Sequence, residues 1–145
     1  MTPTLRDRRW TVHRHIPVPP DLVWQLLTDL TAWPRWGPTV SAATFDDDDA
    51  ALTAGTRGAV KTLFGVSLPF VITDFVPGRR WAWTVAGIPA TVHEVEPAED
   101  GCRASMSAPL WAPAYVPVLE IALARIDRMA RHRHQASRLR EPPDE

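Results

Sequence analysis

The segment that most constrains the fold is residues 114–135, where apolar residues recur at the spacing of an amphipathic helix. One side of the projected helix carries the apolar residues Tyr115, Val118, Leu119, Ala122, Leu123, Ile126, Met129 and Ala130. The opposite side carries Glu120, Ala124, Asp127, Arg128, Arg131 and His132. Because such a helix gains most of its stability by packing its apolar side, the rest of the chain must supply a broad apolar surface.

The residues before this helix have the pattern of short strands separated by proline and glycine. Residues 8–16 alternate between apolar and polar side chains, which predicts a strand that ends at Pro17. A short helix is expected to begin at Pro19 or Pro20, since proline fits the first helical turn, and a second helical turn is expected within residues 32–38. A further strand is predicted at residues 39–45, and a loop at residues 46–55, which begin with four aspartates.

Three hairpins are predicted after this loop, and the length of each turn decides which residues of neighbouring strands share a face. Three-residue turns at residues 65–67 and 87–89 bring the apolar residues to one face, together with an even turn at Pro77-Gly78, alone or with Arg79-Arg80. With a last strand at residues 102–108, the residues expected on the inner face are Val60, Thr62, Phe64, Phe70, Ile72, Asp74, Trp81, Trp83, Val85, Thr91, His93, Val95, Ala104, Met106 and Ala108. We therefore predict an α+β fold with a curved antiparallel sheet of about seven strands wrapped around the long C-terminal helix, and two short helices after the first strand.

The bulk composition indicates a single domain, residues 1–145, with a core at about 8–135 and a frayed tail at 136–145. Hydrophobic residues make up 45% of the chain and charged residues 23%, as in ordinary soluble domains. The net charge of -1 gives no general attraction to nucleic acid or to acidic membranes. The lack of an apolar leader or spanning segment and the single cysteine predict a cytoplasmic protein.

Several segments resemble the SRPBCC superfamily, in particular its polyketide cyclase/dehydrase and lipid-transport branch with the START-like helix-grip fold. They are VWQLLTDLTAWPRW, GTRGAVKT, LPFVITDFVPGRRWAWTV, GIPATVHEVEP and PLWAPAYVPVLEIALARI. The resemblance extends from about Trp10 to Met129. It implies a deep apolar cavity between the sheet and the long helix, although the superfamily includes carriers, cyclases, aromatases and regulators.

Two residues are candidates for acid-base chemistry. The strand pattern turns His93 inward beside Trp83, where an imidazole could move protons or could be a buried structural residue bonded to a neighbouring hydroxyl. Tyr115 begins the long helix, and its phenol could bind a ligand at the pocket mouth or tie the helix to the sheet. Asp74 is also expected on the inner face, where it either needs a partner or caps the turn at Pro77-Gly78. We do not expect Asp74 and His93 to form a dyad.

The function most consistent with these features is the binding of a small hydrophobic ligand, aromatic, polyketide-like or lipid. The expected contact residues are Phe64, Phe70, Ile72, Asp74, Trp81, Trp83, His93, Met106, Trp111, Tyr115, Leu119, Ala122 and Ile126. The alternative is a polyketide cyclase/aromatase or dehydratase that uses His93 and Tyr115 as catalytic residues in the same cavity. Trp33 and Trp36 are interpreted as core rather than lid.

A third interpretation is an interaction module that docks a partner through the outer face of the sheet or the arginine-bearing helix. No cofactor, metal, nucleic acid or membrane span is expected. The histidine pairs His13-x-His15 and His132-x-His134 lack a third ligand, and the aspartate run lacks the glycine and glutamate of a calcium loop. Monomer and dimer are both compatible with the sequence.

Overall fold

The computed structural model describes residues 3–6, 8–47 and 50–140. Its strands are β1 (Thr4–Arg6), β2 (Arg9–Ile16), β3 (Val40–Phe45), β4 (Arg57–Thr62), β5 (Ser67–Val76), β6 (Arg80–Val85), β7 (Ile88–Ala98) and β8 (Gly101–Pro109). Its helices are α1 (Pro20–Thr28), α2 (Trp33–Trp36), the 3-10 helix η1 (Pro113–Tyr115) and α3 (Val116–Arg140). The strands form one antiparallel sheet in the order β1-β2-β8-β7-β6-β5-β4-β3.

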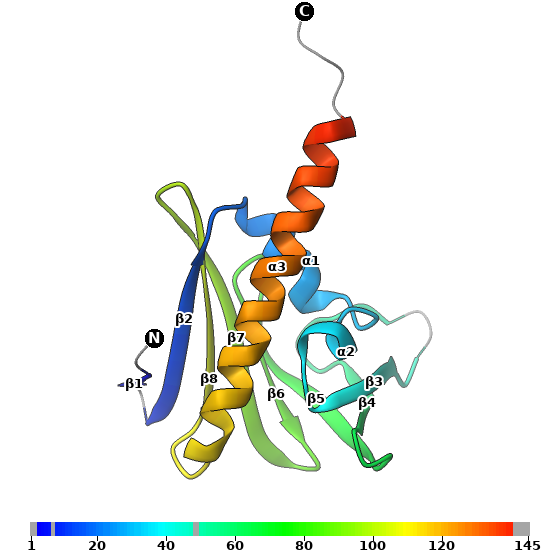
Figure 1. Cartoon of the computed structure of the whole chain (residues 1–145). Coiled ribbons are helices and arrows are strands. Elements are labelled where there is room, and N and C mark those ends of the chain that lie inside the picture. The colour runs from blue at the N-terminus through cyan, green and yellow to red at the C-terminus, as the bar shows by residue number, and fades with distance from the viewer. Residues whose placement is uncertain (1–2, 7, 48–49, 141–145) are drawn as a thin grey trace, which may run out of the picture.

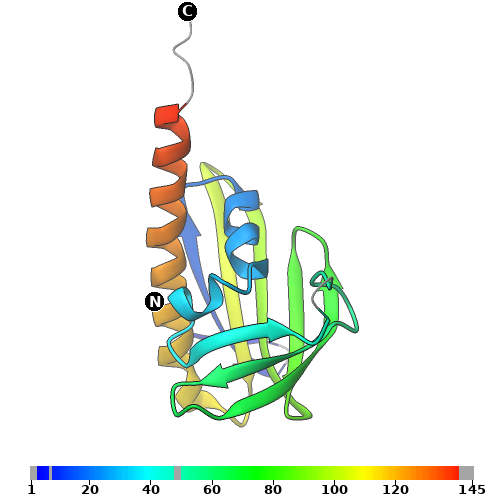
Figure 2. The same ribbon diagram turned by 90° about the vertical axis from the view of Figure 1, so that its right-hand side faces the viewer.

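The sheet is curved, and α3 crosses its inner face beside α1 and α2 (Figures 1 and 2). The prediction of an α+β helix-grip fold is therefore confirmed, including the two short helices after the first long strand. The structure has eight strands rather than about seven, because β1 pairs with β2 at the edge of the sheet. Helix α3 continues to Arg140, past the expected core boundary at about residue 135, and residues 141–145 of the expected frayed tail lie outside the described residues.

The inner face of the sheet contains most of the residues that the sequence placed there. The turns that connect the strands, however, differ in length from the predicted ones. The β6–β7 connection is the two-residue turn Ala86-Gly87, in which both residues have positive φ, as type I′ hairpins require. An irregularity between Ala82 and Thr84 then shifts the pairing by one residue. As a result, His93 pairs with Trp81 and remains on the inner face.

Asp74 is one exception to this agreement, and Phe64, which lies exposed beyond the end of β4, is another. The β5–β6 turn has three residues, Pro77 to Arg79, and the pairing shifts between Ile72 and Asp74. Beyond this bulge Phe75 packs against the core, and Asp74 lies on the outer face of the sheet. There its carboxylate accepts a hydrogen bond from Arg80 Nε at 2.7 Å. The expectation of an inward Asp74 is wrong, because a one-residue bulge exchanges the two faces of a strand.

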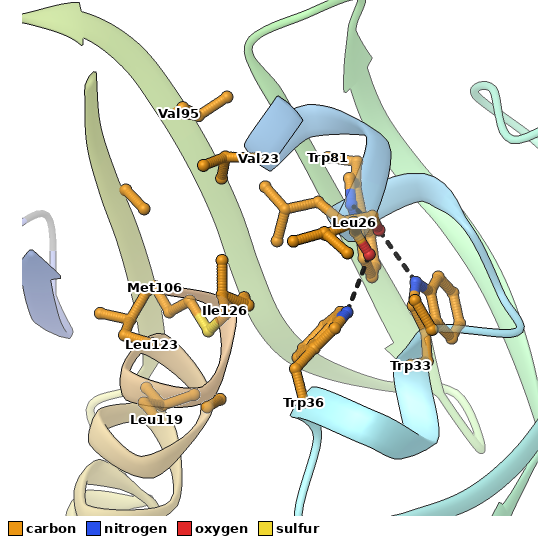
Figure 3. Close-up of a cluster of buried hydrophobic side chains, with 14 of the residues drawn as sticks. Val23, Leu26, Trp33, Trp36, Trp81, Val95, Met106, Leu119, Leu123 and Ile126 are labelled. Carbon is orange, nitrogen blue, oxygen red and sulfur yellow. Dashed lines mark hydrogen bonds between the residues drawn. The ribbon is translucent and has the colours of Figure 1, made fainter. Parts of the chain in front are cut away.

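The core contains a tryptophan cluster at the C-terminal end of α1 (Figure 3). The indole N–H groups of Trp33 and Trp81 donate to the Leu27 carbonyl at 2.9 and 3.0 Å, and that of Trp36 donates to the Leu26 carbonyl at 2.8 Å. The last carbonyls of a helix have no partner within the helix, so these bonds satisfy both the carbonyls of α1 and the buried indole N–H groups. Trp33 and Trp36 are buried and are core residues, as interpreted from the sequence.

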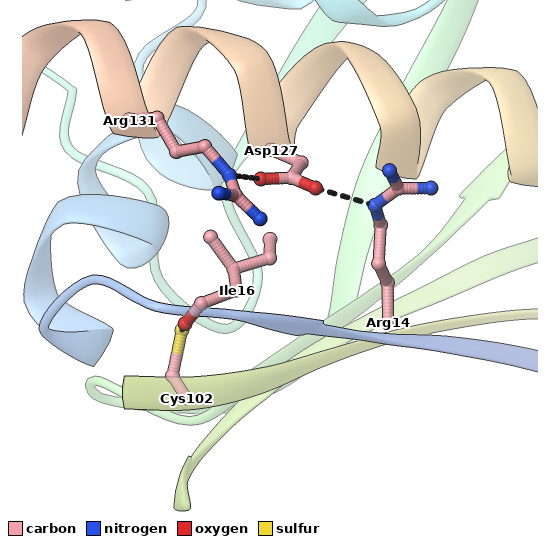
Figure 4. Close-up of polar contacts among 5 residues, drawn as sticks. All are labelled: Arg14, Ile16, Cys102, Asp127 and Arg131. Atoms are coloured by element: carbon pink, nitrogen blue, oxygen red, sulfur yellow. Dashed lines mark hydrogen bonds and ion pairs between the residues drawn. The ribbon is translucent and has the colours of Figure 1, made fainter. Parts of the chain in front are cut away.

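Helix α3 packs through Leu119, Ala122, Leu123 and Ile126, and also through Asp127, which the sequence placed on the solvent side. Asp127 is buried and accepts hydrogen bonds from Arg14 Nε of β2 at 2.6 Å and from Arg131 Nε at 2.5 Å (Figure 4). Burial alone would raise the pKa of Asp127, but the hydrogen bonds and charges of Arg131 and Arg14 outweigh it and lower the pKa. The bond from Arg14 ties α3 to β2, whereas the bond from Arg131 lies within the helix.

Beyond Ala130 the helix α3 has no further buried residue and projects past the sheet (Figure 1). None of the helices in the described part of the chain combines the length and apolarity that a membrane span requires. Cys102 is buried, and its thiol donates to the Ile16 carbonyl at 3.6 Å (Figure 4). Burial, with the nearby charge of Asp127, raises its pKa to about 11, so this thiol is not a reactive nucleophile.

Candidate functional site

An apolar cavity of about 470 Å³ lies at one end of the sheet rather than deep beneath α3. Its walls come from β3, β4 and the β4–β5 turn, from the β6–β7 hairpin, and from the end of β8 with the segment leading to η1. This volume falls within the range of binding pockets for small molecules. We call it the outer cavity.

The lining of the outer cavity is mostly aliphatic and aromatic, with a few hydroxyl groups. The apolar residues include Val60, Leu68, Trp83, Val85, Ile88, Ala108 and Trp111, and the hydroxyl-bearing ones are Thr39, Thr62, Thr91 and Tyr115. Among the described residues that line it there is no carboxylate, and Lys61 is the one charged residue. An apolar wall with a few hydroxyls suits a neutral hydrophobic molecule that bears one or two oxygens.

A second hollow, of about 40 Å³, lies deeper, between α2, β6, β7, β8 and α3. It shares Thr39, Val40, Trp83, Thr91 and Tyr115 with the outer cavity, so these five residues form the boundary between the two spaces. The indole rings of Trp33, Trp36 and Trp81 fill most of the space that the helix-grip arrangement leaves between sheet and helix. We call this small space the inner hollow.

His93 lies at the inner hollow, enclosed by aromatic rings and 3% exposed. Its ring stacks on Trp81 with 3.9 Å between ring centroids, and Trp36 and Trp83 approach it edge-on at 5.9 and 6.1 Å. Burial lowers its pKa to about 3, and a contact with the Trp81 backbone does not offset this effect. At neutral pH the imidazole is therefore uncharged.

A short chain of hydrogen bonds connects His93 to the outer cavity. The indole N–H of Trp83 donates to Thr91 Oγ1 at 2.9 Å, and Thr91 Oγ1 lies 3.0 Å from His93 Nε2. Since Thr91 Oγ1 already accepts from Trp83, its own proton is available to Nε2. The other ring nitrogen, Nδ1, makes no hydrogen bond of normal geometry. The hydroxyl of Thr91 is therefore the partner expected for a buried, structural His93, which was one of the two alternatives raised from the sequence.

Tyr115 stands at the boundary between the two spaces. Its hydroxyl and Thr39 Oγ1 lie 2.8 Å apart, which links η1, directly before α3, to the segment between α2 and β3. Both alternatives raised from the sequence remain compatible with this position. The phenol ties the helix end to the opposite wall, and it also lines the outer cavity.

The residues expected to contact a ligand divide into four groups. Those that line the outer cavity are Phe64, Trp83, Trp111 and Tyr115. Those found at the inner hollow are Trp81, His93, Met106, Leu119 and Ala122. Phe70, Ile72 and Ile126 are buried in the core and line neither space, and Asp74 is on the other face of the sheet. Phe64 was expected on a strand face, but β4 ends at Thr62 and leaves Phe64 in the turn.

The expected set omitted Leu68, Ile88 and Pro109, which also line the outer cavity. Alternation with Phe70 indicates the inward position of Leu68, so this residue could have been included from the sequence. Ile88 could not, because it was placed inside a three-residue turn, whereas it begins β7. Within the described residues no group of three or more histidine, cysteine or acidic residues is arranged to hold a metal ion.

Comparison with known proteins identifies the relatives of this fold. The family model described as polyketide cyclase / dehydrase and lipid transport matches residues 7–135. No curated protein matches the sequence at a significant level.

Solved structures with the same fold include a protein of Nitrosomonas europaea, 18% identical, with a TM-score of 0.64 and coverage of 86% of this chain and 95% of that one. A Mycobacterium smegmatis protein is 17% identical, with a TM-score of 0.63 and coverage of 92% and 97%. A Staphylococcus saprophyticus protein is 14% identical, with a TM-score of 0.65 and coverage of 86% and 92%.

Proposed function

This chain belongs to the polyketide cyclase/dehydrase and lipid transport family, and we propose that it binds a small hydrophobic molecule in the outer cavity. The observation that carries the proposal is the lining of this cavity, which is apolar on most sides, includes Trp83, and offers the hydroxyls of Thr39, Thr62, Thr91 and Tyr115. Burial of apolar surface would supply the affinity, at about 25 cal/mol per Å². The hydroxyls of Thr62, Thr91 and Tyr115 would fix the orientation.

The chemistry of the walls narrows the class of ligand. A flat aromatic or polycyclic molecule can lie against the indole of Trp83, and its carbonyl or hydroxyl oxygens can meet Thr91 and Tyr115. A carboxylate deep in the cavity would lack a cation, whereas one at the mouth would lie beside Lys61. The proposed ligand is thus neutral and aromatic, or a lipid whose charged end stays at the mouth.

A ligand-induced change in melting temperature tests this proposal. A ligand present at about a hundred times its Kd adds roughly 2.7 kcal/mol to the free energy of unfolding. For a chain of this size that corresponds to an increase in Tm of roughly 8 °C. A panel of polycyclic aromatics, aromatic polyketides and fatty acids should contain compounds that give this increase. Native mass spectrometry of protein purified from its host would show any molecule that is carried along.

Two matched variants locate the binding. Ala108→Leu adds bulk to a residue that lines the outer cavity, and Ala59→Leu adds the same bulk to the outer face of β4. The first should abolish the shift in Tm caused by the ligand, and the second should preserve it, with both proteins folded by circular dichroism. If Ala108→Leu does not fold, Thr62→Leu at the wall replaces it. Equal shifts in both variants would place the ligand elsewhere and refute the proposal.

The second candidate function, a polyketide cyclase/aromatase or dehydratase, is favoured by Tyr115 and by the Thr91–His93 hydrogen bond at the inner end of the cavity. In such an enzyme the walls would hold a poly-β-keto chain with its reacting carbons close together, and effective molarity would provide much of the rate. His93 is a poor acid or base at neutral pH, because burial lowers its pKa to about 3. Tyr115 is then the stronger catalytic candidate, and Tyr115→Phe in a cyclisation assay tests it. Unchanged product from Tyr115→Phe and His93→Leu would leave shape alone as the catalyst.

A further inference from the structure

Six large hydrophobic side chains are exposed at the end of the molecule where the outer cavity opens. They are Leu63, Phe64 and Val66 in the β4–β5 connection, Ile88 at the start of β7, and Leu110 and Trp111 after β8. Phe64 is 93% exposed and Trp111 is 68% exposed. We call these six residues the apolar rim. Scattered exposed leucines are ordinary in proteins, but a group on three neighbouring turns needs an explanation.

The three connections lie at the same end of the sheet. In both views the β4–β5, β6–β7 and β8–η1 connections lie at the bottom, and α3 projects from the opposite end (Figures 1 and 2). Four rim residues, Leu63, Phe64, Ile88 and Trp111, also line the outer cavity, while Val66 and Leu110 do not. The apolar rim therefore surrounds the cavity mouth and extends beyond it.

The described charged residues at the same end are cations, among them Lys61 and, at the start of β2, Arg8 and Arg9, of which Arg9 pairs with Pro109 and donates to the Ala90 carbonyl. Residues 61–73, 81–92 and 104–119 contain one charged residue, Lys61, and no carboxylate. Acidic side chains occur toward the opposite end, as in the Glu99-Asp100 turn between β7 and β8. An apolar surface whose described charged neighbours are a few cations can approach the negative surface of a lipid bilayer without repulsion.

We propose that the apolar rim docks this protein on a lipid bilayer, with Phe64 and Trp111 inserted among the acyl chains and headgroups. Aromatic and aliphatic side chains on loop tips can enter the interface while the hydrogen-bonded sheet stays in water. A flat partner protein fits less well, since the rim consists of three separate projecting turns. The biological reason rests on the proposed function: a hydrophobic ligand could pass between bilayer and cavity without crossing water.

Vesicle co-sedimentation of the ligand-free protein tests the docking. The rim variant Val66→Glu/Leu110→Glu changes two residues that do not line the cavity. Its matched control, Val76→Glu/Leu139→Glu, adds the same charge to exposed apolar residues of the β5–β6 hairpin and of projecting α3. Each protein is mixed with phosphatidylcholine vesicles and with phosphatidylcholine–phosphatidylglycerol vesicles. Loss of apolar insertion should weaken binding of the rim variant to both by about tenfold or more, while the control stays within about twofold of the wild type.

Four results would overturn the docking proposal, three of them in the vesicle assay. The first is absence of wild-type binding to either kind of vesicle. The second is equal loss in the rim variant and its control. The third is binding that needs phosphatidylglycerol and disappears in Arg138→Glu/Arg140→Glu, which would assign the attraction to the projecting basic end of α3. Sedimentation velocity tests whether a second copy of this chain occupies the rim. If the wild type is a dimer and the rim variant is a monomer, the rim is an interface between two copies, and docking on lipid is refuted.

The vesicle assay and the ligand assay test the two proposals separately. The vesicle assay uses no ligand, and its rim variant leaves the cavity walls intact, so lost vesicle binding with a preserved ligand shift in Tm refutes docking alone. Vesicle binding by a protein that no ligand stabilises refutes the proposed function alone.

Discussion

Protonation of His93 is expected to make the folded protein unstable in mild acid. Its pKa in the folded state is lowered to about 3 by burial, against 6.5 for an ordinary histidine, which the unfolded chain should have. Below pH 6.5 the His93 imidazole binds a proton in the unfolded state but not in the folded state. The free energy of unfolding is therefore highest above pH 6.5 and falls as the pH decreases from 6.5 toward 3. At 1.36 kcal/mol per pH unit, the loss between pH 8 and pH 5 is about 2 kcal/mol.

Urea unfolding followed by tryptophan fluorescence at pH 8 and pH 5 measures this loss. In His93→Leu the loss should be smaller by about 2 kcal/mol, because leucine binds no proton in either state. His132→Asn, an exposed histidine of α3, provides the matched control and should keep the wild-type dependence. The pKa of Asp127 is lowered, so its contribution is lost only below about pH 4 and does not enter this window.

An equal loss of stability in the wild type and His93→Leu would refute the reasoning. It would mean that water or a proton reaches the imidazole in the folded state, despite its stacking on Trp81. That outcome would also strengthen the cyclase interpretation, because a histidine that titrates near neutral pH can act as an acid or a base. The measurement thus bears on the function as well as on the fold.

Three further perturbations are expected to have distinct effects. Asp127→Asn should lower the free energy of unfolding by about 2 kcal/mol in urea at pH 7, because charge-assisted bonds to Arg14 and Arg131 are lost. The difference from the wild type should shrink below about pH 4, where the wild-type carboxylate takes up a proton. A difference that stays constant with pH would argue against an ionised Asp127. Gly58→Ala should cost about 3 kcal/mol or more, since its Cβ would lie 2.2 Å from the Thr44 carbonyl oxygen, whereas Gly55→Asn in an open turn with positive φ should cost far less. Trp36→Ala should lower the stability by roughly 3–5 kcal/mol and open the inner hollow, so that larger ligands raise its Tm; an unchanged ligand range would show that Trp36 does not limit the cavity.

The sequence was sufficient for the fold because strand alternation and helix periodicity report burial directly. The inner positions of Trp81, Trp83, Thr91, His93 and Val95 were predicted from alternation and agree with the structure. The turn lengths used to reach them were wrong at both later hairpins, and bulges in the strands compensated for the errors. A bulge depends on the fit of a curved sheet around its helix, which no local pattern encodes.

The errors at Asp74 and Asp127 have related causes. Asp74 was misplaced because it lies on the turn side of a bulge, where the alternation of β5 is reversed. Asp127 was assigned to solvent because the helical projection grouped it with Glu120 and Arg131, yet Arg14 of β2 is the partner that makes its burial favourable. The two residues are 113 positions apart in the chain. A pairing of this kind requires the register between α3 and the sheet edge, which sequence periodicity leaves free.

The position of the cavity follows from what the tryptophan side chains bond to. Three indoles donate their N–H groups to the last carbonyls of α1, which fixes their rings beneath α3 and fills the space where the sequence predicted a pocket. Trp83 instead donates to Thr91 and presents its ring to the outer cavity. Hydrophobicity cannot separate these two roles, because both kinds of tryptophan face inward. The hydrogen-bond partner of each indole separates them, and it moves the expected ligand site from the centre of the fold to its open end.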